Sequence, residues 1–368
     1  MSDSSTRHSP QDAMVLLSHL LLQPGDGEGL GFTPLLWGMA EMSREKFETL
    51  VAMADKNHVI VRGLEVFVRM MRGARQDICV QWATTALEAE RKRIDNALSF
   101  LNAVCATFAE EGYDATVIKS LDHWPDLGSD LDLYTSAEPE EICQFMARRF
   151  EARIAPRSWG DRLARKWNFL IPGLPEAVEI HMGRLGQTGE QVPIASWLPA
   201  RARWAVIGDY RFPVSSPSDR VMISTLQRMY RHFYFRLCDI LDTAELVSSG
   251  AIDYDDLRSS ALTAGIWEGV ATYLAIVSDY LKQYRGSGLE IPNFVTAAAR
   301  FGGKEVYFGR GFLRIPIMPQ SAQLYGSQLT GLLRKHELHN SARLGLLPWL
   351  ATAALVGQKI TGSDKGIW

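Results

Sequence analysis

Apolar residues recur at helical spacing through the first part of the chain. The pattern predicts helices over 13–22, 43–54, 58–71 and 84–108, each with one apolar face. Ser43, followed by Glu45 and Glu48, is typical of a helix N-terminus, and Gly112 is well placed to end the last helix. We therefore predict an N-terminal helical region over residues 1–110.

The pattern changes to short apolar and alternating runs between residues 111 and 215. Strands are predicted over 116–118, 131–134, 165–171 and 177–182, with a helix over 138–150 and an edge strand over 210–214. A Pro- and Gly-containing turn at 172–176 joins two of these runs and predicts an antiparallel hairpin. This order of elements predicts an α+β fold in which a small mixed β-sheet is flanked by helices.

Helical patterning returns from residue 216 to the end of the chain. Residues 218–248 are strongly apolar and aromatic, and 254–264 and 267–284 show helical periodicity. Asp253 suits a helix N-cap. Residues 286–320 are rich in Gly, Pro and Phe and receive no assignment. We predict a C-terminal helical region over 216–368.

Composition and charge restrict the classes of protein. With 368 residues, 46% of them hydrophobic and 22% charged, the chain resembles an ordinary soluble globular protein. The formal net charge of −3 provides no general attraction to nucleic acid, which is therefore expected only as an acceptor substrate. The apolar run 344–357 contains Pro348 and is shorter than the roughly 20 residues that span a bilayer. We expect a core or subunit-contact helix there and no membrane insertion.

The cysteines and the first residues favour a reducing compartment. Cys79, Cys105, Cys143 and Cys238 are scattered without paired spacing, which argues against a disulfide framework or a structural zinc site. The first ten residues are polar and lack the apolar segment of a signal peptide. We expect a cytoplasmic protein.

The most informative segment is Gly128-Ser129-Asp130-Leu131-Asp132-Leu133. In a strand, residues two apart point to the same face, so Asp130 and Asp132 would project together. Two adjacent carboxylates repel each other unless a cation or a proton lies between them, and carboxylate oxygens suit Mg²⁺ or Mn²⁺. This pair therefore predicts a metal site.

A third carboxylate is expected at Glu179, in the alternating run Val178-Glu179-Ile180. The predicted hairpin would bring Glu179 beside the two aspartates. Glu176 and Glu190 are nearby alternatives. His181 is expected to point away from Glu179 and to pack.

These features resemble the nucleotidyltransferase superfamily that has a polymerase-β-like catalytic core, and in particular one group of uncharacterised bacterial nucleotidyltransferases. The resemblance rests on the segments Val117-Ile118-Lys119, Asp130-Leu131-Asp132, Glu179-Ile180-His181 and His232 to Ile240, in this order. It spans about residues 45–285. Ser120 departs from the Gly that the group has after the Lys, and Gly128-Ser129 lies directly against Asp130.

The resemblance implies a metal-dependent enzyme that moves a nucleoside monophosphate from an NTP such as ATP to an acceptor hydroxyl, releasing pyrophosphate. Asp130, Asp132 and Glu179 would be the catalytic residues and would hold Mg²⁺ or Mn²⁺ ions. Lys119, Gly128 and Ser129 would contact the nucleotide phosphates. The acceptor could be a small molecule, a sugar, an RNA end or a protein.

Two other functions stay open. The chain could be a catalytically inactive nucleotide- or partner-binding protein on a degenerate core, or a toxin-like transferase acting on tRNA. The basic stretch Arg157, Arg162, Arg165 and Lys166 could neutralise a triphosphate or form a solvated helix face. Arg231, His232 and Arg236 could pack structurally or line the acceptor cleft.

Overall fold

The computed structural model describes residues 10–23, 42–350 and 352–353. It is a mixed α+β structure with a mixed sheet between two helical regions, which confirms the predicted fold class. The N-terminal helices are α1 (Pro10–Leu22), α3 (Arg44–Lys56), α4 (Ile60–Gly73) and α5 (Asp77–Glu110).

The N-terminal helices begin and end close to the predicted positions. The Ser43 hydroxyl accepts the backbone N–H of Lys46 at 3.3 Å, so the predicted N-cap of α3 is confirmed. Helix α5 starts seven residues earlier than predicted, at Asp77. At its other end Phe108 is fully buried and meets Phe145 of α6 (Pro139–Phe150) edge to face, with ring centroids 4.9 Å apart. This contact joins α5 to α6.

The described residues form a central sheet of seven strands in the order β3-β4-β5-β2-β1-β7-β6. The strands are β1 (Thr116–Val117), β2 (Asp130–Thr135), β3 (Arg153–Ile154), β4 (Lys166–Leu170), β5 (Ala177–Met182), β6 (Arg203–Ile207) and β7 (Tyr210–Val214). The predicted hairpin is confirmed, because β4 and β5 pair antiparallel. Strand β2 pairs with β5 in parallel, and this register sets Asp132 opposite Glu179.

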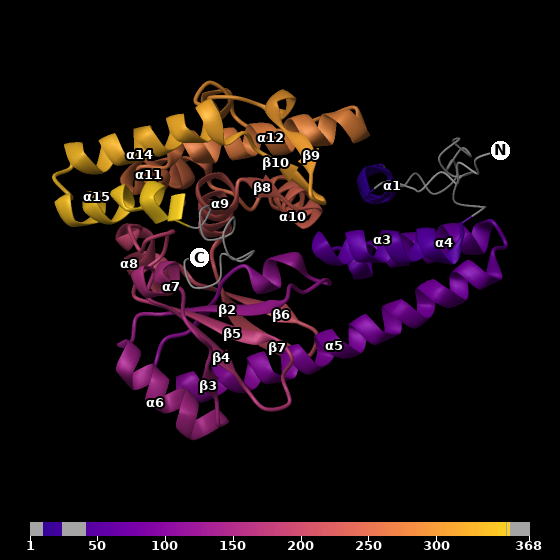
Figure 1. Ribbon diagram of the computed structural model, residues 1–368, viewed down its shortest axis with the longest axis horizontal. Helices are drawn as coiled ribbons and strands as arrows, with labels where there is room; N and C mark the ends of the chain where they lie inside the picture. The colour runs from indigo at the N-terminus through magenta and orange to yellow at the C-terminus, as the bar shows by residue number, and fades with distance from the viewer. Residues whose placement is uncertain (1–9, 24–41, 351, 354–368) are drawn as a thin grey trace.

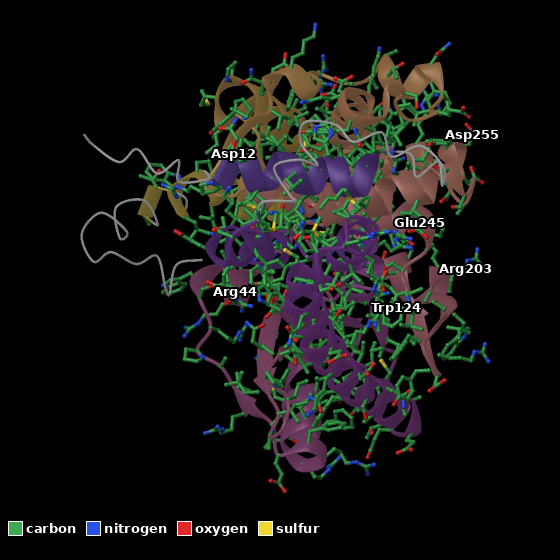
Figure 2. All side chains as sticks on the ribbon, turned by 90° about the vertical axis from the view of Figure 1, so that its right-hand side faces the viewer. Asp12, Arg44, Trp124, Arg203, Glu245 and Asp255 are labelled. Atoms are coloured by element: carbon green, nitrogen blue, oxygen red, sulfur yellow. The ribbon has the colours of Figure 1, made fainter. Side chains whose placement is uncertain are left out.

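The predicted position of one strand in the sheet is wrong. Strand β7 lies between β1 and β6, not at the edge. The edge strand β6 was not predicted, because its apolar side chains do not mark a buried face. Trp204 is 65% exposed and Val206 is 71% exposed. Figure 2 shows Arg203 of β6 at the outer side of the molecule.

The predicted helical stretch 218–248 is broken in the middle. Helix α9 (Pro217–Thr225) continues as the π-helix η2 (Leu226–His232), and α10 (Leu237–Ser248) starts after the short strand β8 (Tyr234–Phe235). The break lies at Phe233, which has a φ of 55°. There the carbonyl of Phe233 accepts the N–H of Ile315 at 2.9 Å, and β8 pairs with β10 (Phe312–Arg314). Pairing with a distant segment thus overrides local helical preference.

The unassigned region 286–320 supplies the partners of that second sheet. Strand β9 (Tyr307–Gly309) pairs with β10, giving a three-stranded sheet in the order β8-β10-β9. The predicted Asp253 cap is confirmed, since its carboxylate accepts two N–H groups at the start of α11. The remaining helices are α7 (Trp159–Leu163), α8 (Val192–Arg201), α11 (Tyr254–Ala264), α12 (Trp267–Arg285), α13 (Asn293–Thr296), α14 (Ala322–Arg334) and α15 (Leu338–Gly345).

Helices lie on two sides of the sheet (Figure 1). Helices α5 and α6 run below it in this view, and the C-terminal helices α11, α12, α14 and α15 lie above it. Within the described ranges, no helix is long and apolar enough to cross a membrane. Residues 351 and 354–357 of the apolar run near the end of the chain lie outside the described residues. All four cysteines are free thiols, and Cys143 alone among them is half-buried.

Candidate functional site

A strained turn at the end of β1 presents Lys119. The N–H of Ser120 donates to the carbonyl of Ile118 at 2.7 Å, and Lys119 between them has φ 64° and ψ −56°. These angles are those of a classic γ-turn, which is rare and costs about 1–3 kcal/mol for a residue with a side chain. Such a conformation persists when its surroundings fix it, and strained residues of this kind cluster at functional sites.

Ser120 fixes the turn to strand β2. Its hydroxyl accepts the backbone N–H of Asp132 at 2.7 Å and lies 3.1 Å from the carbonyl oxygen of Asp130. The hydroxyl also lies 3.5 Å from Oδ2 of Asp132. Ser120 therefore holds strand β2 in place beside the aspartates.

Two of the predicted carboxylates share a cation. The ammonium of Lys119 forms an ion pair with Oδ1 of Asp132 and lies 3.4 Å from Oε1 of Glu179. Burial raises the pKa of Asp132 to about 7; Lys119 opposes this rise, and the charge of Glu179 adds to it. At physiological pH Asp132 is therefore partly protonated, and the proton and the Lys119 ammonium together reduce the repulsion between the two carboxylates.

Glu179 is the carboxylate that stays ionised. Burial alone would raise its pKa, but Lys119, His181 and Lys166 together lower it well below the usual range. Lys166 Nζ lies 2.9 Å from Oε2 of Glu179 and 2.9 Å from Oδ1 of Asp161. Of the four cations in the predicted basic stretch, Lys166 reaches the site because it faces inward from β4.

The prediction that His181 points away from Glu179 is wrong. His181 Nε2 donates to Oε1 of Glu179 at 2.9 Å, because residues two apart in a regular strand face the same side. Burial lowers the pKa of His181 to about 4, so the ring is neutral and its buried Nδ1 has no hydrogen-bond partner among the described residues. His181 is therefore a further polar group in the site, which the period of the strand alone would have predicted.

Asp130, Gly128 and Ser129 complete the predicted set. Asp130 is exposed, whereas Asp132 is half-buried. Burial, followed by the charge of Glu179, raises its pKa. All six predicted site residues line one pocket of about 210 Å³: Lys119, Gly128, Ser129, Asp130, Asp132 and Glu179. The alternatives Glu176 and Glu190 do not line it: Glu176 pairs with Arg93, and Glu190 accepts the N–H of Thr188.

The Gly128-Ser129 turn is held from outside the pocket. Arg93 of α5 donates to the carbonyls of Leu127 and Gly128, at 2.9 and 3.3 Å. A Cβ on Gly128 would lie 2.9 Å from Cε1 of His58. The glycine therefore allows His58 to approach, which is a structural reason for it independent of the predicted contact with phosphate.

The opposite side of the pocket is basic. Arg228, Arg231 and Arg236, here called the arginine wall, line it together with Gln227, His232 and Tyr234. Arg228 is buried and pairs with Asp239 at 2.7 Å. For Arg231 no ion-pair partner occurs within the described part of the chain. Asp239 also accepts the N–H of Arg236 at 2.7 Å, a contact that caps α10.

The arginine wall was not predicted from the sequence pattern, because the wall forms only where the helix is interrupted at Phe233. In one continuous helix Arg231 and Arg236 would lie on different faces, since five residues turn a helix by about 500°. The π-helix and the strand β8 bring both to the pocket instead. Burial and the neighbouring arginines lower the pKa of His232 well below its usual range, so this ring adds no charge.

The carboxylates, here called the carboxylate wall (Asp130, Asp132 and Glu179), have suitable donors for a divalent cation. Ligand atoms of Asp132, Glu179 and His181 lie within 4.8 Å of one another. The oxygen donors suit Mg²⁺ or Mn²⁺, and the cation now between Asp132 and Glu179 is the ammonium of Lys119. No protein-family model matches the chain, and no curated protein matches it significantly.

Proposed function

We propose that the protein is a metal-dependent nucleotidyltransferase, which moves an NMP group from an NTP to an acceptor hydroxyl and releases pyrophosphate. The observation that supports this most strongly is the pocket with a carboxylate wall on one side and an arginine wall on the other. A magnesium nucleotide has the matching distribution of charge, with a cation at one side and phosphate oxygens at the other.

The carboxylate wall would hold the metal. Asp130, Asp132 and Glu179 would provide the oxygen ligands for Mg²⁺ or Mn²⁺, which when bound polarises the phosphate and lowers the pKa of the acceptor hydroxyl. Lys119 would then be free to pair with a phosphate oxygen, since it lies in the same pocket. Gly128 and Ser129 stay candidates for contacts with the same phosphates.

The arginine wall would bind the triphosphate. Arg231 has no ion-pair partner among the described residues, and Nη1 of the buried Arg228 has no hydrogen-bond acceptor there. A buried N–H group without an acceptor is costly, and a phosphate oxygen would satisfy Nη1 of Arg228. These two arginines favour an anionic ligand over a neutral one.

The proton of the acceptor hydroxyl must leave as the bond to phosphorus forms. Glu179 is a weak proton acceptor, because Lys119, Lys166 and His181 hold it ionised. Asp132 has a pKa of about 7 in the site without metal, and a bound metal ion would lower it, so Asp132 would also be a weak base. The hydroxyl oxygen would form a bond to the α-phosphorus, the bond from that phosphorus to the bridging oxygen would break, and the proton would pass to water in the pocket.

A second function is favoured by one specific contact. The ammonium of Lys119 already neutralises Asp132 and Glu179, so the fold does not need a metal ion to bury them. A protein that binds a nucleotide or a partner without turnover would have the same arrangement. The two proposals differ in whether Mg²⁺ is required.

The test is to incubate the full chain with Mg²⁺ and each α-labelled NTP, with and without a cell lysate, and to follow pyrophosphate release and label transfer. Asp132→Asn should reduce transfer at least about 100-fold, the scale of losing one group that stabilises transition-state charge. Asp209→Asn, at an exposed turn between β6 and β7, is the matched control and should transfer normally.

The outcomes separate the proposals. Transfer by wild type and by Asp209→Asn, but not by Asp132→Asn, supports the transferase, and the labelled product identifies the acceptor. Nucleotide binding without transfer, equal with and without Mg²⁺, supports the non-catalytic alternative. If neither nucleotide binding nor transfer occurs, both proposals are wrong.

A further inference from the structure

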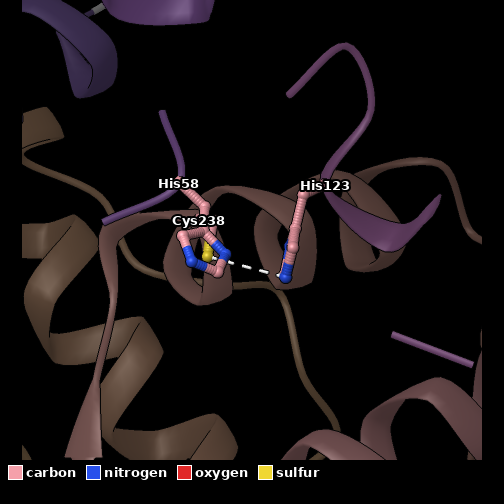
Figure 3. A group of neighbouring side chains, drawn as sticks. All are labelled: His58, His123 and Cys238. Carbon is pink, nitrogen blue, oxygen red and sulfur yellow. Dashed lines mark hydrogen bonds between the residues drawn. The ribbon is translucent and has the colours of Figure 1, made fainter. Parts of the chain in front are cut away.

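A second cluster of metal-binding side chains lies beside the pocket. His58 lies between α3 and α4, His123 ends the 3₁₀ helix η1 (Ser120–His123), and Cys238 lies in the first turn of α10 (Figure 3). One nitrogen of each His and the sulfur of Cys238 all lie within 4.8 Å of one another. The function proposed above makes no use of these three groups as a set.

The distances suit a tetrahedral metal ion. Cys238 Sγ lies 3.8 Å from His123 Nε2. A zinc ion with Zn–S of about 2.3 Å and Zn–N of about 2.1 Å places its sulfur and nitrogen ligands about 3.6 Å apart. A small inward movement of the side chains would therefore complete the coordination of three ligands.

The backbone around His58 is fixed against α10. The neighbouring Asn57 accepts the N–H of Cys238 at its carbonyl (3.2 Å) and the N–H of Leu237 at its side-chain oxygen (3.1 Å). Gly128 leaves room for the His58 ring, because a Cβ there would lie 2.9 Å from Cε1. His58 and Cys238 are thus held together by contacts that do not involve their own side chains.

Asp242 orients His123. Its Oδ2 accepts a hydrogen bond from His123 Nδ1 at 2.5 Å, which leaves Nε2 as the nitrogen that faces Cys238. Arg62 fixes Asp242 in turn, with Nη1 2.8 Å from Oδ1. A carboxylate behind a histidine is the usual support of a metal-bound imidazole.

The Nδ1 lone pair of His58 faces Arg236, whose guanidinium a metal ion at this nitrogen would replace. Arg236 Nη1 lies 3.4 Å from His58 Nδ1, and a guanidinium can only donate, so this nitrogen is unprotonated. Burial, and then the charge of Arg236, lowers the pKa of His58. The ring is therefore neutral at physiological pH.

A nucleophilic role for Cys238 is excluded by its surroundings. Cys238, His123 and Asp242 are arranged as a nucleophile, a base and an orienting carboxylate would be. However, Cys238 has 0% exposure and does not line the pocket, whereas His58 and His123 do. A substrate in the pocket cannot reach the sulfur, but a metal ion enclosed by the three side chains can.

We propose that His58, His123 and Cys238 bind a zinc-class divalent ion, with the fourth coordination position open to the pocket. A Cys and His set of three protein ligands is typical of such sites. The ion would join three segments of the chain that are far apart in sequence, at the edge of the nucleotide pocket. It is separate from the carboxylate wall and does not depend on the function proposed for it.

The first experiment is to titrate the chelator-treated full chain with Co²⁺ and record the absorption spectrum. Binding at this site gives a thiolate-to-cobalt charge-transfer band and the strong visible bands of a tetrahedral ion, at one ion per chain. Competition with Zn²⁺ should abolish both. The absence of a thiolate band at saturating Co²⁺ in the wild type overturns the proposal without any variant.

Variants assign the ligands. Cys238→Ser should lose the charge-transfer band, and His58→Ala should weaken Zn²⁺ binding more than about 100-fold, beyond the usual cost of losing an outer-shell partner. Asp242→Asn, which weakens the support of His123 and the ion pair with Arg62 but changes no ligand, should weaken it about 10- to 100-fold. Circular dichroism and thermal unfolding check that each variant is folded.

Matched controls distinguish this site from other thiols and from the carboxylate wall. Cys105→Ser changes another buried thiol, on α5, and should leave the spectrum unchanged. Asp132→Asn should also leave it unchanged, even if transfer is lost. A band that persists in Cys238→Ser, or disappears in Cys105→Ser, would show that the ligand is a different cysteine.

Discussion

The two walls of the pocket are built in different ways. The carboxylate wall comes from β2 and β5, neighbouring strands of one regular sheet, and its register is fixed by the pairing of Asp132 with Glu179. The arginine wall comes from a π-helix, a left-handed residue and a two-residue strand. The residues of the carboxylate wall follow the two-residue period of a strand, whereas those of the arginine wall follow no regular period.

The difference shows where sequence patterns specify a site. In a strand, one buried face determines which side every other residue points to, so a pair such as Asp130 and Asp132 can be read directly. Where a helix is interrupted, the direction of each side chain depends on the distant segment that pairs with the interrupted backbone. Here that partner is β10, about 80 residues further along the chain.

The largest expected effect comes from removing the cation between the carboxylates. Lys119→Ala leaves Asp132 and Glu179 buried with one cation fewer, so stability should fall by about 3 kcal/mol, the scale of breaking a buried ion pair. If the carboxylate wall binds metal, Mg²⁺ should raise the melting temperature of this variant more than that of the wild type. Chemical denaturation with and without Mg²⁺ measures both.

The matched control for Lys119→Ala is Lys92→Ala, at an exposed position on α5. It should lose little stability. Equal melting temperatures for the Lys119 variant with and without Mg²⁺ would contradict metal binding at this wall.

The pH dependence of Mg²⁺ affinity tests the carboxylate wall. The folded-state pKa of Asp132 is raised to about 7, so its contribution to stability is present at low pH and is lost as the pH rises through about 7. Mg²⁺ needs the ionised form, so Mg²⁺ affinity should rise up to about tenfold per pH unit until the pH passes 7. Glu179 has the opposite sign, but its lowered pKa keeps it ionised across this range.

Calorimetric Mg²⁺ titrations and melting curves between about pH 5.5 and 8.5 provide the measurement. Asp132→Asn should lose the pH dependence of Mg²⁺ affinity. Its melting curves should keep the contribution of the buried histidines His58, His181 and His232, whose pKa values are lowered. Mg²⁺ affinity that stays constant across this range would mean that Asp132 is not a ligand.

The arginine wall is tested by Arg231→Ala. Loss of one charged hydrogen bond, worth about 1.5 kcal/mol, should weaken NTP binding about tenfold and reduce its dependence on salt. Stability should hardly change, since Arg231 has no ion pair within the described residues. Isothermal titration with an NTP at two salt concentrations measures this effect, and Arg203→Ala on the exposed edge strand β6 is the control.

The smallest expected effect distinguishes two reasons for a glycine at position 128: room for the His58 ring, or contact with a nucleotide phosphate. Gly128→Ala places a Cβ 2.9 Å from His58 Cε1, so His58 must move, at a cost of about 1 kcal/mol. Zn²⁺ affinity should fall by a similar free energy, while NTP binding should be unaffected. Gly73→Ala, where a Cβ meets nothing within 4 Å, is the control. Weaker NTP binding with unchanged Zn²⁺ affinity would instead support the phosphate contact.

Much of the fold could be predicted because its patterns are local. The cap at Ser43, the hairpin of β4 and β5 and the helix after Asp253 each follow from a few neighbouring residues. The strands β3 and β6 were missed, since two residues and a strand with exposed apolar side chains give no clear alternation. The break at Phe233 was missed because the local sequence favours a helix.

The amino-acid sequence by itself determined the α+β class and the set of residues that line one side of the pocket. Hydrophobic periodicity is a property of consecutive residues, so it needs no knowledge of distant partners. Only the tertiary structure decided that Lys119 lies between Asp132 and Glu179, that three arginines face them, and that His58 and His123 meet Cys238. Those contacts join residues 13 to 180 positions apart, and their geometry depends on how whole elements pack against one another.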